Sequence, residues 1–288
     1  MGGRIERSLT LMGASWRVLG QGKDLILIPV ASMAALVVWT LLCLGAALAF
    51  GAEDRLLDFA IDRSFSSFGR LAPVDYVLIY ACVAGGAFLT VFFNAAIVAA
   101  ALERLEGRQA SARDGIRMTW ERRTYVLEWA LFSATVGLIV MAIRSKGDWV
   151  GRVFAWLFDI AWGYATVFVA PVLVTREVGP IDALRSSAAL FKKTWGENIV
   201  QDIGMGVLVL GAIIAAVAIA LPVGLAFGLI PGIVVAGVLI AAVSAVFSAF
   251  DSVFNAALFR YATTGEPPAA FASLDLGRAY IPKAEKKS

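Results

Sequence analysis

Long apolar runs without charged residues dominate the chain. The longest extends from Ile203 to Phe250, 48 consecutive residues that include no Lys, Arg, Asp or Glu. A helix needs only ~20 apolar residues to cross ~30 Å of hydrocarbon, so this run is long enough for two crossings. Residues that break helices are grouped near its middle: Pro222, Gly224, Gly228, Pro231 and Gly232. The pattern predicts a membrane hairpin.

The rest of the chain repeats this pattern, and we expect an all-α, polytopic membrane helix bundle. Only helices and closed barrels satisfy every backbone polar group in lipid, and the apolar blocks show no period-two alternation. The six expected spans are roughly Leu25–Phe50, Val74–Leu102, Val126–Ile143, Val150–Val174, Ile203–Leu221 and Ile233–Phe259. We expect residues 1–265 to form a single membrane domain and residues 266–288 to form an extended or disordered cytoplasmic tail.

Two segments that precede spans have the spacing of amphipathic helices. Their apolar positions step by three or four residues: Ile5, Leu9, Met12, Trp16 and Leu19 in the first, and Ile181, Leu184, Ala188, Phe191 and Trp195 in the second. Such spacing places the apolar side chains on one helical face. A basic helix with an apolar, Trp-bearing face lies in the headgroup plane. We therefore predict cytoplasmic interfacial helices here. A middle segment with Ile116 and Trp120 fits less well, because Arg113 falls at an apolar position.

Three spans also end in a similar way. Two read Phe-Asn-Ala-Ala and continue to a glycine, at Phe93–Gly107 and Phe254–Gly265, and the third reads Phe-Val-Ala-Pro and continues to Gly179. One interpretation is a three-fold repeat about the membrane normal, an arrangement that some transporters share. The other is chance similarity between short apolar segments, and both stay open.

The distribution of Lys and Arg predicts the orientation. Of the 25 basic residues, 19 fall in the N-terminal segment, the second-to-third and fourth-to-fifth connections, and the C-terminal end. Cytoplasmic segments of membrane proteins carry an excess of Lys and Arg. We therefore expect a multi-pass protein of the bacterial or archaeal cytoplasmic membrane with both termini in the cytoplasm.

Composition agrees with a membrane protein and argues against several functions. Hydrophobic residues make up 60% and charged residues 16% of the chain, against about 45–50% and about 25% in soluble domains. The net charge of +3 is too small to indicate nucleic-acid binding. Histidine is absent, and no nucleophile elbow or phosphate loop is found. Cys43 and Cys82 lie in apolar runs, so we expect neither a disulfide framework nor a thiolate zinc site. We expect no enzymatic activity, cofactor or metal.

Several stretches carry a resemblance to a known family. Those stretches are Ser15–Leu19, Phe92–Ala96, Trp129–Ile139 and Trp162–Glu197. They resemble an uncharacterised family of prokaryotic multi-pass membrane proteins, a domain of unknown function, over most of the chain up to about Gly265. The resemblance implies a fold and no chemistry. The plan of six spans and cytoplasmic helices is also loosely similar to the membrane domain fused to some glycerophosphodiester phosphodiesterases.

Polar side chains inside the spans are the first candidate site, because ionisable groups in a membrane are rare and often functional. They are Asp159 in the fourth span, Asp251 and Asn255 on a polar stripe of the sixth, and Asn94 in the second. One interpretation is a path for a cation, proton or small polar solute. The other is hydrogen bonding between helices, and Asp251 could pair with Arg260 or Arg185. Arg152, two turns before Asp159, is too distant for direct contact with it.

The second candidate site is the surface of the cytoplasmic helices. It comprises Trp16, Trp120, Arg185, Phe191, Lys192, Lys193 and Trp195. We expect a non-catalytic scaffold, accessory or bilayer-organising role in which this surface engages anionic lipid head groups or a protein partner. The alternative is a small transporter or channel lined by the intramembrane Asp and Asn residues. Rows of small residues such as Ala241, Ala245 and Ala249 serve internal packing or homo-oligomer formation, and both stay open.

Overall fold

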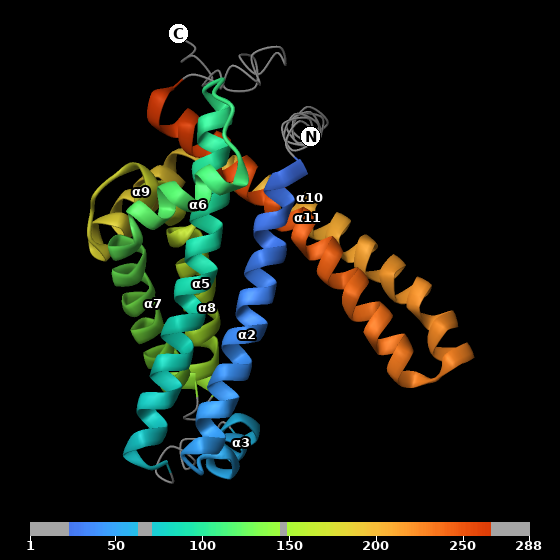
Figure 1. Ribbon diagram of the computed structural model, residues 1–288. Coiled ribbons are helices and arrows are strands. Elements are labelled where there is room, and N and C mark those ends of the chain that lie inside the picture. Colours follow the sequence, from blue (N-terminus) through green and yellow to red (C-terminus); the bar gives the residue numbers. More distant parts are fainter. Residues whose placement is uncertain (1–22, 63–70, 145–148, 266–288) are drawn as a thin grey trace. The chain divides into compact units, whose positions relative to one another are not determined.

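The computed structural model describes residues 23–62, 71–144 and 149–265, without the side chains of residues 23, 60–62, 194–205 and 207 (Figure 1). This part of the chain is all-α, as predicted. Its elements are a short 3-10 helix η1 (Lys23–Ile26) and the helices α2 (Leu27–Ala49), α3 (Glu53–Asp62), α5 (Pro73–Leu105), α6 (Ala112–Glu121), α7 (Arg123–Arg144), α8 (Trp149–Thr166), α9 (Val169–Thr175), α10 (Pro180–Phe227) and α11 (Leu229–Thr264).

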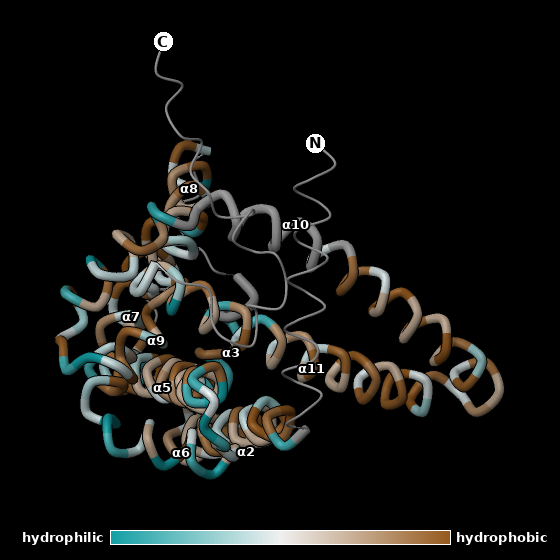
Figure 2. Tube along the Cα trace, turned by 90° about the horizontal axis from the view of Figure 1, so that it is seen from above, coloured by the Kyte–Doolittle hydropathy of each residue, from teal (hydrophilic) through white to brown (hydrophobic). Residues whose placement is uncertain are grey.

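Six helical segments are long and apolar enough to cross a membrane, which confirms the predicted number of spans. They are Asp24–Ala49, Pro73–Leu105, Arg123–Arg144, Trp149–Thr175, Leu208–Phe227 and Leu229–Thr264. In Figure 2, hydrophobic residues predominate along α5 and α11, whereas α6 has more hydrophilic residues. The chain has the architecture of a multi-pass membrane protein.

The turn between the last two spans is tighter than the sequence suggested. Helix α10 continues through Pro222, and the only break is Gly228, whose φ of 100° suits glycine. Pro231 lies in the first turn of α11, where its missing N–H removes no intrahelical bond. Gly224 and Gly232 then lie against each other, because a Cβ built on Gly232 would come within 2.7 Å of the Gly224 Cα. The glycines spaced by four residues therefore serve the hairpin turn.

The chain divides into two compact units. The first comprises residues 1–30, 97–115 and 192–288, and the second comprises residues 31–96 and 116–191. In the second unit α2, α5, α7 and α8 run alongside one another (Figure 1). The Tyr80 hydroxyl of α5 lies 3.4 Å from the Leu131 carbonyl oxygen of α7, and Trp129 of α7 stacks on Trp162 of α8 with ring centroids 6.0 Å apart.

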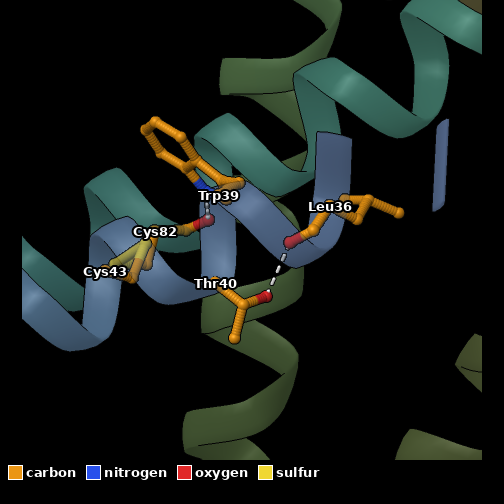
Figure 3. The surroundings of a disulfide bond; sticks show 5 residues. All are labelled: Leu36, Trp39, Thr40, Cys43 and Cys82. Atoms are coloured by element: carbon orange, nitrogen blue, oxygen red, sulfur yellow. Dashed lines mark hydrogen bonds between the residues drawn. A yellow bond between two sulfur atoms is a disulfide. The ribbon is translucent and has the colours of Figure 1, made fainter. Parts of the chain in front are cut away.

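A disulfide between Cys43 and Cys82 joins α2 to α5, so the expectation that the cysteines would not pair is wrong (Figure 3). Their Cα atoms are 5.9 Å apart, within the range that a disulfide spans. The two apolar runs form neighbouring helices, and both cysteines lie toward the ends that α3 connects. Beside them, the Trp39 indole N–H donates to the Cys82 carbonyl oxygen at 2.9 Å. Gly85 makes room for this indole, since a Cβ there would lie 2.1 Å from a ring carbon.

The fourth span is broken near Pro171. Helix α8 ends at Thr166 and α9 begins at Val169, because a proline ring clashes with the carbonyl four residues earlier. The N–H of Phe168, in the break, is buried and donates to the Ser187 hydroxyl of α10 at 3.0 Å. The Ser187 side chain is fully buried. A hydroxyl from another helix thus accepts a hydrogen bond from a backbone N–H at the break.

In the first unit, one carboxylate joins three segments that are distant in sequence. Asp24 of η1 accepts from the Arg104 guanidinium of α5 at 2.8 Å and from the Ala112 backbone N–H of α6 at 2.8 Å. The Nε of Arg104 also donates to the Ala110 carbonyl oxygen at 2.7 Å. Apolar side chains from η1, α2, α5 and α11 are buried in the same unit: Leu25, Ile28, Ile97, Leu105, Val253 and Phe254.

Two of the three helix ends that suggested a three-fold repeat have the same conformation. Gly107 and Gly265 both have the positive φ of a helix C-terminal cap, 83° and 75°. Ala95, Ala96 and Ala256 of the two Phe-Asn-Ala-Ala stretches are fully buried. The middle copy differs, because α9 ends at Arg176 in an extended conformation. The N-terminal amphipathic segment and the tail lie outside the described residues.

Replacing Ser187 by Ala is expected to destabilise the protein. The variant removes the 3.0 Å hydrogen bond from the buried Phe168 N–H, and loss of a buried hydrogen bond costs about 1–3 kcal/mol. The measurement is thermal unfolding in detergent, with Ser186→Ala as the matched control, because Ser186 is half-buried on the neighbouring face. Equal unfolding temperatures for the two variants would contradict the role given to Ser187.

The purified protein is also expected to have no free thiol. A maleimide–polyethylene glycol reagent added in denaturant should modify two cysteines only after reduction, because Cys43 and Cys82 are bonded to each other. Cys43→Ser should expose one reactive thiol without reduction. Two modified thiols in the unreduced wild type would contradict the pairing.

Candidate functional site

Asp159 is paired with an arginine of the neighbouring span. Its carboxylate lies 2.5 Å from the guanidinium of Arg144, and Arg144 is the last residue of α7. The two side chains are 54% and 51% exposed. The sequence analysis considered only Arg152 as a partner, because it compared residues within one helix. The antiparallel packing of α7 on α8 brings Arg144 into contact instead.

Asp251 and Asn255 lie together on α11. The Asn255 amide donates to the Asp251 carboxylate at 3.1 Å, one helical turn away. Both side chains are half-buried. The two arginines considered as partners of Asp251 make other ion pairs: Arg260 with Glu106 at 3.1 Å and Arg185 with Asp182 at 3.5 Å.

Asn94 lies on α5 and is exposed. It belongs to the second unit, as Asp159 does, whereas Asp251 and Asn255 belong to the first. The structure therefore brings Asp251 together with Asn255 and Asp159 together with Arg144. Among the described residues, no group of three or more acidic or Cys side chains could hold a metal ion.

The first four turns of α10 carry most of the second candidate surface. Pro180 begins the helix, and the Ala183 N–H bonds to the Gly179 carbonyl oxygen at 2.9 Å. Ala183, Ser187 and Leu190 are buried, and Phe191 stacks on Tyr164 of α8 at 5.0 Å. The opposite face is exposed: Ile181, Asp182, Arg185, Lys192 and Lys193.

The buried row of α10 is offset from the apolar row read in the sequence, since Ile181 is 55% exposed. The physical reason is the break in the fourth span, whose Phe168 N–H requires the Ser187 hydroxyl. The apolar side of this segment thus packs on the protein. The side chain of Trp195 and the whole of Trp16 lie outside the described residues.

Trp120 lies at the end of α6, just before α7. Its ring packs edge-on against Phe92 at 6.1 Å between centroids. The Arg123 guanidinium lies over the same ring, 5.4 Å from the centroid, in cation–π geometry. The Trp side chain is nevertheless 55% exposed. Such an aromatic residue beside an arginine is typical of the membrane–water interface.

Sequence reasoning missed the ion pairs at the helix ends. Arg108 contacts Glu103 and Glu106, and Arg122 lies 3.4 Å from Glu177. At the other end of α5, Arg55 of α3 makes a bidentate pair with the fully buried Asp75, at 2.7 and 3.0 Å. These hydrogen bonds raise the pKa of Arg55 and of Arg108. The sequence does contain a signal for these ion pairs, because acidic and basic residues occur at the ends of neighbouring helices.

Comparison with known proteins supports the resemblance to an uncharacterised family. A family model described as a family of unknown function (DUF6159) matches residues 73–269. The match begins with α5 and ends just after α11, so it includes five of the six spans. No curated protein and no solved structure matches the chain significantly. The chain therefore belongs to the family of unknown function DUF6159.

Proposed function

We propose that this protein is a non-catalytic component of a prokaryotic cytoplasmic membrane, with a scaffold, accessory or bilayer-organising role. Its working surface is the exposed basic face of α10, formed by Arg185, Lys192 and Lys193. The ligands are anionic head groups of the cytoplasmic leaflet or an acidic segment of a protein partner. Both termini are cytoplasmic in this proposal, in line with the distribution of Lys and Arg.

The observation that carries the proposal is the division of α10 into two faces. One face is occupied by contacts within the protein, through Ser187, Leu190 and Phe191. The other exposes three cations and one acidic residue, Asp182. Because Asp182 is only 3.5 Å from Arg185, the two lysines contribute most of the unpaired charge. A fixed cationic face of this kind attracts anionic lipid.

The pairing of the intramembrane polar groups supports the same proposal. Asp159 has a cationic partner in Arg144, and Asp251 accepts a hydrogen bond from Asn255. Carboxylates held in this way stabilise contacts within and between helices. They do not require a solute to satisfy them.

Neutralising the basic face is expected to weaken binding of anionic lipid. In nanodiscs of phosphatidylcholine and phosphatidylglycerol, the triple variant Arg185→Gln, Lys192→Gln, Lys193→Gln should retain about tenfold less phosphatidylglycerol than the wild type by native mass spectrometry. Each cation near an anionic surface contributes about 1 kcal/mol before screening. The control is Asp182→Asn, which removes a negative charge from the same face and should therefore retain slightly more phosphatidylglycerol than the wild type.

Equal retention by the wild type and the triple variant would contradict lipid binding at this face. A proton or cation flux in liposomes that disappears in Asp159→Asn or Asp251→Asn would contradict the non-transporting role.

A further inference from the structure

The start of α7 and the end of α9 lie side by side in the second unit, at a position that we call the common level. Arg122, just before α7, lies 3.4 Å from Glu177, just after α9. From that level α7 rises 21 residues to Arg144, about 32 Å at 1.5 Å per residue. The hydrocarbon core is about 30 Å thick. A hydrocarbon core that begins at the common level would therefore end close to Arg144.

The same count along α9 and α8 places Asp159 about 24 Å above the common level and Arg152 about 35 Å above it. Arg144 reaches down to Asp159 from the boundary, which accounts for their contact across 15 residues of sequence. In a membrane whose hydrocarbon core begins at the common level, Arg152 would lie about 5 Å beyond the core, in the layer of the phosphates. By the predicted orientation this layer belongs to the outer leaflet.

Arg152 belongs to an exposed stripe on α8, which we call the α8 stripe and which consists of Trp149, Arg152, Trp156, Asp159 and Gly163. These positions step by three and four residues, so they share one helical face. The two indoles are 68% and 61% exposed. A Cβ built on Gly163 would meet nothing within 4 Å. No described part of the chain covers this face.

The charge of Arg152 is not compensated within the described residues, because it makes no hydrogen bond or ion pair there. Asp159, the acidic residue of the stripe, is already engaged by Arg144. An exposed guanidinium between two exposed indoles, at the level of the phosphates, has the chemistry that binds a phosphodiester. Indole rings favour the same interfacial layer.

We propose that the α8 stripe binds the phosphate of an anionic outer-leaflet phospholipid, with Arg152 as the residue that binds it. The guanidinium donates to the phosphate oxygens, and Trp149 and Trp156 pack against the glycerol region on either side. The Arg144–Asp159 ion pair lies at the end of the site that is nearest to the hydrocarbon core. This site lies at the end of the second unit opposite to the Arg122–Glu177 contact, and it does not depend on the role proposed for α10.

The test uses the full chain in nanodiscs that contain increasing amounts of phosphatidylglycerol. Arg152→Gln is expected to weaken lipid binding about fivefold, the contribution of one interfacial cation, whereas Arg152→Lys keeps most of it. Arg176→Gln is the matched control, since Arg176 is an exposed arginine at the other end of the fourth span. Its lipid binding should fall less than that of Arg152→Gln. Because the α10 residues are intact in all three variants, failure here is distinguishable from failure of the proposed function.

A second measurement locates the lipid without a charge substitution. Brominated phosphatidylglycerol should quench the fluorescence of the wild type more than brominated phosphatidylcholine, and Trp149→Phe with Trp156→Phe should remove the difference. Equal quenching by both lipids, or equal binding by Arg152→Gln and Arg176→Gln, would overturn the proposal. Displacement of the lipid by millimolar inorganic phosphate would identify free phosphate as the ligand and would also overturn it.

Discussion

Hydrocarbon supplies no hydrogen-bonding partners, and this constraint accounts for most of the polar contacts in the structure. A backbone or side-chain group that enters the membrane must be satisfied within the protein or at its boundary. Ser187 satisfies the Phe168 N–H at the break before Pro171. Trp39, a large side chain with one polar atom, places its N–H on the Cys82 carbonyl oxygen. Each of these contacts also joins one helix to another. The hydrogen bonds that satisfy the polar groups therefore also hold the bundle together.

Ion pairs perform the same task at helix ends within each unit. In the first unit Asp24, Arg104 and the Ala112 N–H hold η1, α5 and α6 together, and Glu106 binds Arg260 of α11. At the other end of α5, Asp75 is fully buried and is engaged by both nitrogens of the Arg55 fork. A buried carboxylate is tolerated only when it is paired in this way. The exposed cations on α10 and at Arg152 are among those available to an external anion.

The sequence predicted the parts of the fold that depend on composition and charge. The six spans follow from the length of the apolar runs, and the last hairpin follows from a charge-free stretch that is twice the length of one crossing. The contacts between helices could not be predicted in the same way. Neither the Cys43–Cys82 disulfide nor the Arg144–Asp159 pair can be inferred from spacing along one helix, because both depend on how neighbouring spans are aligned. Similarly, the buried face of α10 depends on Ser187 meeting an N–H that only the broken helix exposes.

The central claim of this account is that paired charges hold the spans together. Exchange of the Arg144 and Asp159 charges tests it most directly, with unfolding followed in detergent for Arg144→Asp, Asp159→Arg and the double variant. Each single reversal should lower stability, because it places like charges in contact across α7 and α8. The double variant should recover most of the loss, since it restores an opposite-charge pair at the same position. A double variant no more stable than the single ones would contradict the claim.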